Sequence, residues 1–214
     1  MSNIDVRRFY ETFDFEGMIT NPPKLIQDFL DGEIDFIKKH INGKSILEIG
    51  CGYGRLLKIM KMKNKRIVGI DFSQRMVDLA KKNVENVEIY QMNANKLNFE
   101  SGEFDEVVCL DNSFGNMPGI ELDALQEMTR VCKKGGEIII SVFSENARDV
   151  QIENYKRIGL KEVRDDGDAI KTKEGFYSRR FKKEELEELF RKCGLKCNIN
   201  KICPVNYIAY AIKH

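Results

Sequence analysis

The residues best placed for chemistry lie in a glycine-rich stretch that follows a short apolar run. Residues 46–49 are apolar except for Glu48, and three glycines follow at alternate positions, Gly50, Gly52 and Gly54. An amphipathic stretch, residues 56–62, comes directly after them. This order predicts a strand, a tight turn and a helix start, an arrangement that brings backbone N–H groups against a nucleotide-like ligand. Glycine suits these positions because a Cβ would block both the turn and the approach of the ligand.

A carboxylate at the end of the next predicted strand fits the same ligand. The strand-like run Arg66–Asp71 ends in an acid 21 residues after Gly50. In nucleotide-binding α/β folds an acid at this place accepts hydrogen bonds from the hydroxyls of a ribose. Ser73 is expected to cap the helix that follows. The loop and the acid together indicate one nucleotide-like ligand at one edge of a sheet.

Two further polar stretches follow predicted strands. Residues 93–95 come after the third strand, predicted over residues 87–91, and residues 111–112 come after the fourth, predicted over residues 104–110. In open α/β sheets ligands bind off the carboxyl ends of the strands. Both stretches are therefore candidates for contacts with the same ligand.

The pattern from Glu48 to Gly54, E-x-G-x-G-x-G, resembles the first motif of the class I S-adenosylmethionine-dependent methyltransferases. The dinucleotide fingerprint G-x-G-x-x-G fits less well, because Gly54 comes one position early and Arg55 stands where the third glycine is required. The resemblance to the methyltransferases spans about Ser45 to Phe143. An NAD-dependent dehydrogenase is accordingly the weakest alternative.

Two later segments extend the resemblance and each departs from it at one residue. Residues 92–99 stand where the family commonly has G-D-A-x-x-L-P-F, with Asn93 in place of the Asp that contacts the adenine amino group. An Asn carbonyl oxygen can still accept that hydrogen bond, without charge assistance. Residues 109–114, C-L-D-N-S-F, look like the C-L-G-N-S-F segment of glycine N-methyltransferases, which lies beside the transferred methyl. Asp111 in place of Gly argues against assuming the same substrate.

The resemblance implies S-adenosylmethionine as cofactor and S-adenosylhomocysteine as product. The sulfonium carries its own reactivity, so the protein must mainly align the acceptor, the methyl carbon and the sulfur for in-line displacement. Asp111 and Asn112 are the expected catalytic residues, beside the methyl, where they orient an amine or hydroxyl. The expected cofactor-binding residues are Glu48, Gly50, Cys51, Gly52, Gly54, Asp71, Phe72, Asn93, Ala94 and Asn95. Further substrate candidates are Tyr10, Tyr155, Tyr177, Arg179 and Arg180.

The elements that must position these residues alternate along the chain. We expect an α/β fold, a Rossmann-like, doubly wound, mostly parallel sheet of seven strands that ends in a C-terminal antiparallel hairpin. The methyltransferase domain is predicted over residues 45–214, with a substrate-cap insertion at residues 144–180. The fifth strand is predicted at 137–143, after a turn at 133–136, and the hairpin strands at 196–203 and 205–212. Helices are predicted over Lys24–His40 and residues 56–62, 122–131 and 181–193.

The N-terminal segment, residues 1–44, is predicted to be helical and aromatic at its start. Phe9, Tyr10, Phe13 and Phe15 are interleaved with acidic residues. Two interpretations stay open: the aromatic side chains pack against the core, or they form a lid over the ligand.

Composition narrows the class of protein. The chain has 214 residues, of which 42% are hydrophobic and 32% charged, and its formal charge is +1. A chain that grips nucleic acid through the backbone usually has a marked basic excess, so nucleic acid is disfavoured as a partner. Six cysteines lack the paired spacing of zinc sites, and we expect no metal. The only histidines, His40 and His214, lie at a helix end and a terminus, which argues against a histidine general base.

No apolar run approaches the roughly 20 residues of a membrane span, and the polar N-terminus lacks the apolar segment of a signal peptide. We therefore expect a cytoplasmic methyltransferase, a monomer or homodimer, that acts on nitrogen or oxygen of a small molecule. The alternatives are a protein or RNA methyltransferase and a non-catalytic S-adenosylmethionine-binding partner subunit.

Overall fold

The central sheet has seven strands in the order β3-β2-β1-β4-β5-β10-β9 in the computed structural model, which describes residues 3–13, 20–61 and 66–214. Strands β1 to β5 pair in parallel, and β10 pairs antiparallel with β5 and β9. The bounds are β1 (Ser45–Ile49), β2 (Arg66–Asp71), β3 (Glu88–Gln91), β4 (Phe104–Cys109), β5 (Cys132–Ser144), β9 (Asn198–Asn200) and β10 (Asn206–Ile212). This is the predicted sheet, with its last strand inserted beside the fifth.

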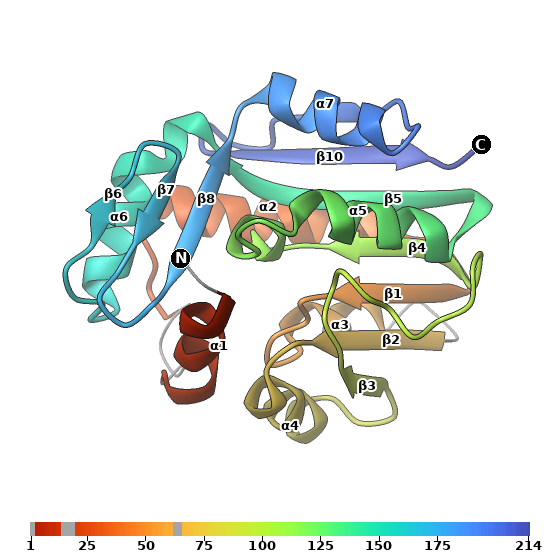
Figure 1. Ribbon diagram of the computed structural model, residues 1–214, viewed down its shortest axis with the longest axis horizontal. Helices are drawn as coiled ribbons and strands as arrows, with labels where there is room; N and C mark the ends of the chain where they lie inside the picture. The colour runs from red at the N-terminus through yellow and green to blue at the C-terminus, as the bar shows by residue number, and fades with distance from the viewer. Residues whose placement is uncertain (1–2, 14–19, 62–65) are drawn as a thin grey trace.

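The register of the parallel strands brings the predicted site residues to one edge. Leu47 in the middle of β1 lies opposite Val68 of β2 and Val107 of β4. Parallel strands have their carboxyl ends on the same side of a sheet. The glycine loop after β1, the acid that ends β2 and the polar stretch after β4 therefore meet at the carboxyl edge (Figure 1).

Helices cover both faces of the sheet, as a doubly wound fold requires (Figure 1). Helices α5 (Glu121–Val131) and α7 (Lys183–Lys192) bury apolar side chains against one face. Helices α2 (Lys24–His40), α3 (Arg55–Met60) and α4 (Gln74–Asn83) do the same on the other. Because both faces are covered, the inner strands are apolar throughout, and each of the five residues of β1 is buried.

The insertion (residues 144–180) extends the sheet beyond the end of β4. It contains η2 (Glu145–Ala147), α6 (Arg148–Arg157), β6 (Arg164–Asp165), β7 (Ala169–Lys171) and most of β8 (Tyr177–Phe181). Strand β8 pairs in parallel with the last two residues of β5, Phe143 opposite Arg180 and Ser144 opposite Phe181. Strands β6, β7 and β8 pair antiparallel. The insertion and helix α1 (Asn3–Thr12) lie together beyond the carboxyl edge (Figure 1).

The N-terminal aromatic cluster joins α1 to the insertion. Phe9 is fully buried, and its ring centroid lies 4.9 Å from that of Phe176. Tyr155 and Ile170 belong to the same buried cluster. Phe9 thus packs as a core residue, while the next residue, Tyr10, lines a cavity at the sheet edge. Phe15 lies outside the described residues.

Several element bounds differ from prediction for local reasons. Residues 133–136, where a turn was expected, form a bulge within β5. Phe104 of β4 pairs with Cys132 and Glu106 pairs with Glu137, so one residue of β4 lies opposite four residues of β5. Strand β9 is shorter than predicted because the chain turns near Cys203, whose N–H donates to the side chain of Asn206 at 2.9 Å. None of the described helices combines the length and apolarity that crossing a membrane demands.

Candidate functional site

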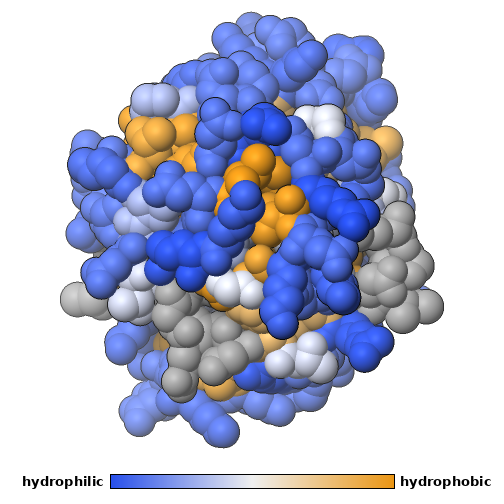
Figure 2. Space-filling view, turned by 90° about the vertical axis from the view of Figure 1, so that its left-hand side faces the viewer, coloured by the Kyte–Doolittle hydropathy of each residue, from blue (hydrophilic) through white to orange (hydrophobic). Residues whose placement is uncertain are grey.

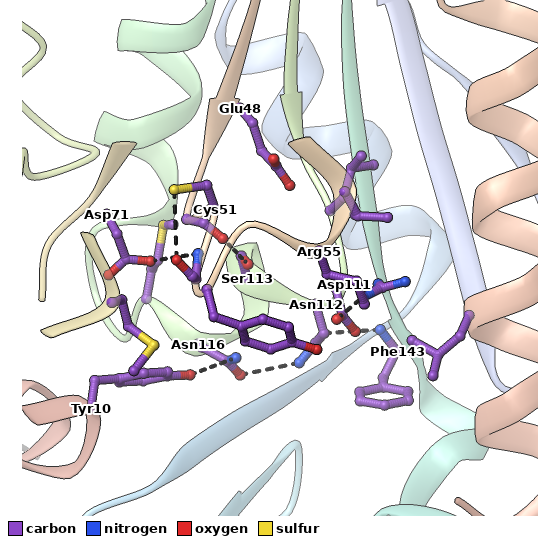
Figure 3. A pocket seen from close by; sticks show the side chains of 18 of the residues that line it. Tyr10, Glu48, Cys51, Arg55, Asp71, Asp111, Asn112, Ser113, Asn116 and Phe143 are labelled. Carbon is purple, nitrogen blue, oxygen red and sulfur yellow. Dashed lines mark hydrogen bonds and ion pairs between the residues drawn. The ribbon is translucent and has the colours of Figure 1, made fainter. Parts of the chain in front are cut away.

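Two adjoining cavities open at the carboxyl edge of the sheet, and Figure 3 shows side chains that line the larger one. The larger cavity runs from the glycine loop toward α2 and the insertion, and the smaller cavity lies between α1 and the ends of β2 and β3. Both are lined by the same five residues where they meet: Gly50, Asp71, Phe72, Asn116 and Met117. An elongated ligand can therefore occupy both cavities and pass Asp71 in the middle.

The three glycines of the loop have different roles. All three have positive φ, +72° at Gly50, +51° at Gly52 and +87° at Gly54, a region that favours glycine. A Cβ at Gly52 would have no atom of the described residues within 4 Å, so open space adjoins this residue, which lines the larger cavity. A Cβ at Gly54 would lie 2.8 Å from the Val84 side chain. Gly54 therefore allows the loop to pack against α4 and lines neither cavity.

Asp71 is buried between the two cavities. Its carboxylate accepts hydrogen bonds from the N–H groups of Gly52 and Ser73, each at 3.0 Å. Burial raises the pKa of Asp71 to about 6, because the loss of solvent outweighs these two hydrogen bonds. Ser73 caps α4 as predicted, its hydroxyl accepting from the N–H of Met76 at 3.3 Å. Carboxylate oxygens have further lone pairs, so Asp71 can still accept hydrogen bonds from a ligand.

Glu48 has a buried carboxylate oxygen that is not satisfied by the protein. The residue is 3% exposed, and its Oε2 has no hydrogen-bond partner among the described residues. In Figure 3 the side chain stands at the cavity with no interaction drawn to it. Burial raises the pKa of Glu48 well above its ordinary value, and Arg55 opposes that shift. A buried unpaired acceptor is unfavourable, so a ligand ammonium or N–H group would be stabilised there.

The smaller cavity has the apolar walls that a flat ring needs. Val6 of α1, Phe72, Met92 and Ile120 line it, together with Asn93 and Ala94. Asn93 is exposed and can offer its carbonyl oxygen to an amino group. Asn95, predicted as an alternative contact, lines neither cavity.

The two residues after β4 form a strained turn. Asp111 and Asn112 both have positive φ, +52° and +56°, although neither is glycine. Consecutive left-handed residues of this kind persist only where surrounding contacts fix them. Asn112 supplies such contacts: it accepts from the N–H of Phe143 at 3.0 Å and donates to Asn116 and to Ser178, at 3.2 and 3.0 Å (Figure 3). Its side chain is thereby used within the protein, whereas the Asp111 side chain is 43% exposed at the larger cavity.

Glu33 of α2, which was not predicted as a site residue, holds both the backbone and, through Arg55, the carboxylate of Asp111. Its Oε1 accepts from the N–H of Asp111 at 2.6 Å and from the Ser141 hydroxyl. Its Oε2 pairs with Arg55 at 3.0 Å, and Arg55 pairs with the Asp111 carboxylate at 2.9 Å. Glu33 is fully buried. The available signal was an acid on the apolar face of a predicted helix, four residues after Phe29.

The predicted substrate residues divide into two groups. Tyr10 and Tyr155 line the larger cavity, but both hydroxyls are engaged, with Asn116 at 3.0 Å and with Ser178 at 2.8 Å.

The other three candidates, Tyr177, Arg179 and Arg180, line neither cavity. Arg179 pairs with Asp168 and Glu185, both at 2.9 Å. Arg180 is buried in the insertion, where it donates to Gln151 at 3.0 Å. The structure brings to the cavity instead an apolar wall that the sequence analysis did not assign: Ile26, Phe29, Leu30 and Phe143.

Comparison with known proteins agrees with this geometry. Residues 46–136 match a family model described as a methyltransferase domain. The chain is 33% identical over 181 residues to the uncharacterized protein MJ1252 of Methanocaldococcus jannaschii, covering 77% of this chain and 66% of that protein. It is 26% identical over 207 residues to the ubiquinone biosynthesis O-methyltransferase of Dechloromonas aromatica, covering 89% of this chain and 88% of that one.

Among solved structures, the PH0226 protein from Pyrococcus horikoshii has the same fold. The TM-score is 0.73 at 20% identity, over 95% of this chain and 100% of that chain. The two cavities also fit S-adenosylmethionine. Glu48 has a carboxylate oxygen without a partner among the described residues, and Gly52 adjoins open space. Asp71 lies between the smaller cavity and the glycine loop. Residues 46–136 are thus an S-adenosylmethionine-dependent methyltransferase domain, and the chain as a whole has the fold of this class of enzyme.

Proposed function

We propose that this protein methylates a nitrogen or oxygen atom of a small molecule. The cofactor, when bound, supplies a methyl group on a sulfonium that is a good leaving group. In this proposal the smaller cavity holds adenine, Asp71 accepts from the ribose hydroxyls, and Glu48 faces the ammonium of the methionine moiety. Each assignment rests on the burial and the free hydrogen-bonding capacity of the residue concerned.

The observation that carries the proposal is the apolar end of the larger cavity. Beyond the glycine loop the cavity is walled by three side chains of α2, Ile26, Phe29 and Leu30, and by Phe143 at the end of β5. Tyr10 from α1 and Phe176 from the insertion close it from the other side. The outer face of this end is largely hydrophilic, with a small apolar patch near its middle (Figure 2). Such a chamber suits a compact acceptor better than a polymer.

The charges at the cavity also favour a small molecule over a nucleic acid. The charged residues that line the larger cavity, within the described parts of the chain, are Glu48, Asp71, Asp111 and Arg55. Arg55 is already paired with Glu33 and Asp111. A phosphate backbone would therefore meet carboxylates and no cation that is free to pair with it. The similarity to an enzyme named as a ubiquinone biosynthesis O-methyltransferase supports oxygen as one acceptor atom.

Asp111 and Asn112 take different parts in this proposal. The partly exposed Asp111 carboxylate accepts an N–H or O–H hydrogen bond from the acceptor and aims its lone pair at the methyl carbon. Asn112 is a positioning residue, because its carboxamide is used to hold the turn and the insertion together. The proton lost by the acceptor passes to Asp111 or to solvent as the new bond forms and the carbon–sulfur bond breaks.

The test is a transfer experiment with methyl-labelled S-adenosylmethionine. Purified protein is incubated with a cell extract that has been separated into small molecules, RNA and protein. We expect label in the small-molecule fraction, and none when Asp71→Ala replaces the wild type. Label in RNA or protein would support the macromolecular alternative. Tight binding of S-adenosylhomocysteine with no transfer to any fraction would support a non-catalytic partner subunit.

A further inference from the structure

The geometry points to Tyr53, the residue between Gly52 and Gly54, as the side chain that makes a polar contact with the methyl acceptor. It also points to the acceptor as a compact apolar molecule with an uncharged or cationic N–H or O–H head group, and not an anion. This inference rests on the proposed function and names the substrate class for the same site.

The Tyr53 hydroxyl is buried without a partner. Tyr53 lines the larger cavity, and its hydroxyl oxygen has no hydrogen-bond partner among the described residues. The backbone is held in place, since the Tyr53 carbonyl oxygen accepts from the Asn83 side chain at 3.0 Å. Burial raises the pKa of Tyr53, so the hydroxyl keeps its proton and can both donate and accept. A buried hydroxyl without a partner is unfavourable, and a ligand group that pairs with it removes that penalty.

The other tyrosine hydroxyls at this cavity are already engaged. Tyr10 accepts from Asn116 at 3.0 Å, and Tyr155 is bonded to Ser178 at 2.8 Å. Tyr53 thus has the unused hydroxyl among the three tyrosines that line the larger cavity in the described residues.

The wall of the cavity defines the body of the acceptor. Ile26, Phe29 and Leu30 project from one face of α2, and the ring of Phe29 packs edge-on against Phe143 with a centroid distance of 5.1 Å. All four residues are at least 93% buried in the protein, so the contacts they offer to a ligand are apolar and rigid. An aromatic ring or a short branched hydrocarbon matches such a wall.

The charges define the head group. Asp111 lines the same cavity as Tyr53, and its negative charge raises the pKa of the Tyr53 hydroxyl, while the charge of Arg55 opposes that shift. Arg55, the cation at this place, is held by Glu33 and Asp111. A carboxylate or phosphate on the acceptor would meet the Asp111 carboxylate and, among the described residues that line the larger cavity, no free cation. An amine or a hydroxyl can donate to Asp111 and pair with Tyr53.

Three probes of equal size separate these possibilities: p-cresol, benzylamine and benzoate, which are neutral, cationic and anionic at neutral pH. Each is titrated calorimetrically into the protein saturated with S-adenosylhomocysteine. We expect p-cresol and benzylamine to bind at millimolar concentrations or below, and benzoate to bind at least about tenfold more weakly, because its carboxylate meets that of Asp111 and no free cation among the described residues that line this cavity. Equal or tighter binding of benzoate, or binding of none of the three, overturns the inference.

The variant Tyr53→Phe tests the residue itself. Loss of one hydrogen bond should weaken binding of p-cresol and benzylamine by about fivefold to tenfold, with the affinity for S-adenosylhomocysteine unchanged. The matched control is Tyr207→Phe, which removes a hydroxyl that donates to Glu145 at 3.1 Å, away from both cavities. An equal loss in S-adenosylhomocysteine affinity in Tyr53→Phe would assign Tyr53 to the cofactor and overturn the inference.

Two further readouts keep the outcomes distinct. Tyr53→Phe should keep or raise the denaturation midpoint, because it removes an unpaired buried hydroxyl, whereas Tyr207→Phe should lower it. A lower midpoint in Tyr53→Phe would show that the hydroxyl has a partner within the protein. Failure of the wild type to bind S-adenosylhomocysteine would refute the proposed function as well. Normal binding with probe affinities that do not respond to Tyr53 would refute this inference alone.

Discussion

Replacing Glu33 by alanine removes one partner from each of three groups beneath the site, of which the Asp111 N–H keeps the Ser141 hydroxyl oxygen at 2.9 Å. The Asp111 N–H and the Ser141 hydroxyl lose a shared acceptor, and the Arg55 guanidinium loses one of its two carboxylates. Glu33 is fully buried, so water does not readily replace the missing oxygens. The turn at Asp111, whose φ is +52°, also loses the contact that holds it from the α2 side.

The expected magnitude follows from these contacts. Removing one partner of a buried ion pair costs about 3–5 kcal/mol, and each unsatisfied buried donor about 1–3 kcal/mol. These energy costs cannot simply be added, because one side chain supplies all three bonds. We therefore expect Glu33→Ala to lower the free energy of unfolding by about 3–5 kcal/mol. Turnover should fall as well, since Asp111 is no longer fixed.

The variant Glu33→Gln tests the contribution of the charge, because glutamine keeps nearly the same side-chain shape as glutamate. Its amide oxygen can still accept from the Asp111 N–H and from Ser141, but its NH₂ group faces the Arg55 guanidinium, donor against donor. We expect a loss of about 1–3 kcal/mol, less than for alanine, because two of the three bonds remain.

The measurement is equilibrium unfolding in urea, followed by circular dichroism. Asp35→Ala is the matched control, an exposed acid two residues away on the same helix. The control should change the unfolding free energy by no more than about 0.5 kcal/mol. If Glu33→Ala were as stable as Asp35→Ala, the network beneath Asp111 would contribute nothing, and its role in holding the turn would be refuted.

Three further predictions concern other parts of the site. The pKa of Asp71 is raised from 3.8 to about 6, so the folded protein binds this proton more tightly than the unfolded chain. The free energy of unfolding of the free protein should then fall by up to about 3 kcal/mol between about pH 4 and pH 6, and urea titrations of Asp71→Asn should lack this part of the decline. Because we propose that Asp111 contacts the acceptor, Asp111→Ala should keep S-adenosylhomocysteine affinity within about twofold and should depress turnover. Loss of cofactor binding by calorimetry would move Asp111 to the cofactor side. Gly54→Ala places a Cβ 2.8 Å from Val84 at a φ of +87° and should destabilise the fold by about 1–3 kcal/mol, while the folded fraction still binds S-adenosylhomocysteine.

The cofactor half of the site was predictable because its signals are local. A glycine loop between a strand and a helix, and an acid at the end of the next strand, are fixed by a few adjacent residues each. The parallel register then places the Asp71 carboxylate 3.0 Å from the Gly52 N–H, and no contact with a distant segment is needed to predict this. The mostly parallel sheet with a C-terminal antiparallel hairpin was predicted from the alternation of apolar runs and helices together with the family resemblance, and the structure confirms it.

The acceptor half was not predictable because it depends on contacts between distant segments. Glu33 and Asp111 are 78 positions apart and meet because α2 packs across the sheet edge. The insertion contains strands of two and three residues, β6 and β7, which are too short to show an alternating pattern. Arg180 was predicted at the substrate, but its place on β8 buries its side chain among Gln151 and Asp165 of the insertion.

The way the insertion joins the sheet has a consequence for building chimaeras. Strand β5 pairs with β4 as far as Ile140 and with β8 from Phe143 onward. Asn112 connects β5 to β8 there, because it accepts from the Phe143 N–H and donates to the Ser178 hydroxyl. The insertion is therefore a graftable continuation of the sheet with a defined junction. A transplanted insertion from another methyltransferase must match Phe143 and Ser144 on β5, the carboxamide of Asn112 after β4, and the ring of Phe9 on α1. With these contacts kept, the part of the larger cavity that Asn154, Tyr155 and Phe176 form becomes exchangeable, while the glycine loop and Asp71 stay unchanged.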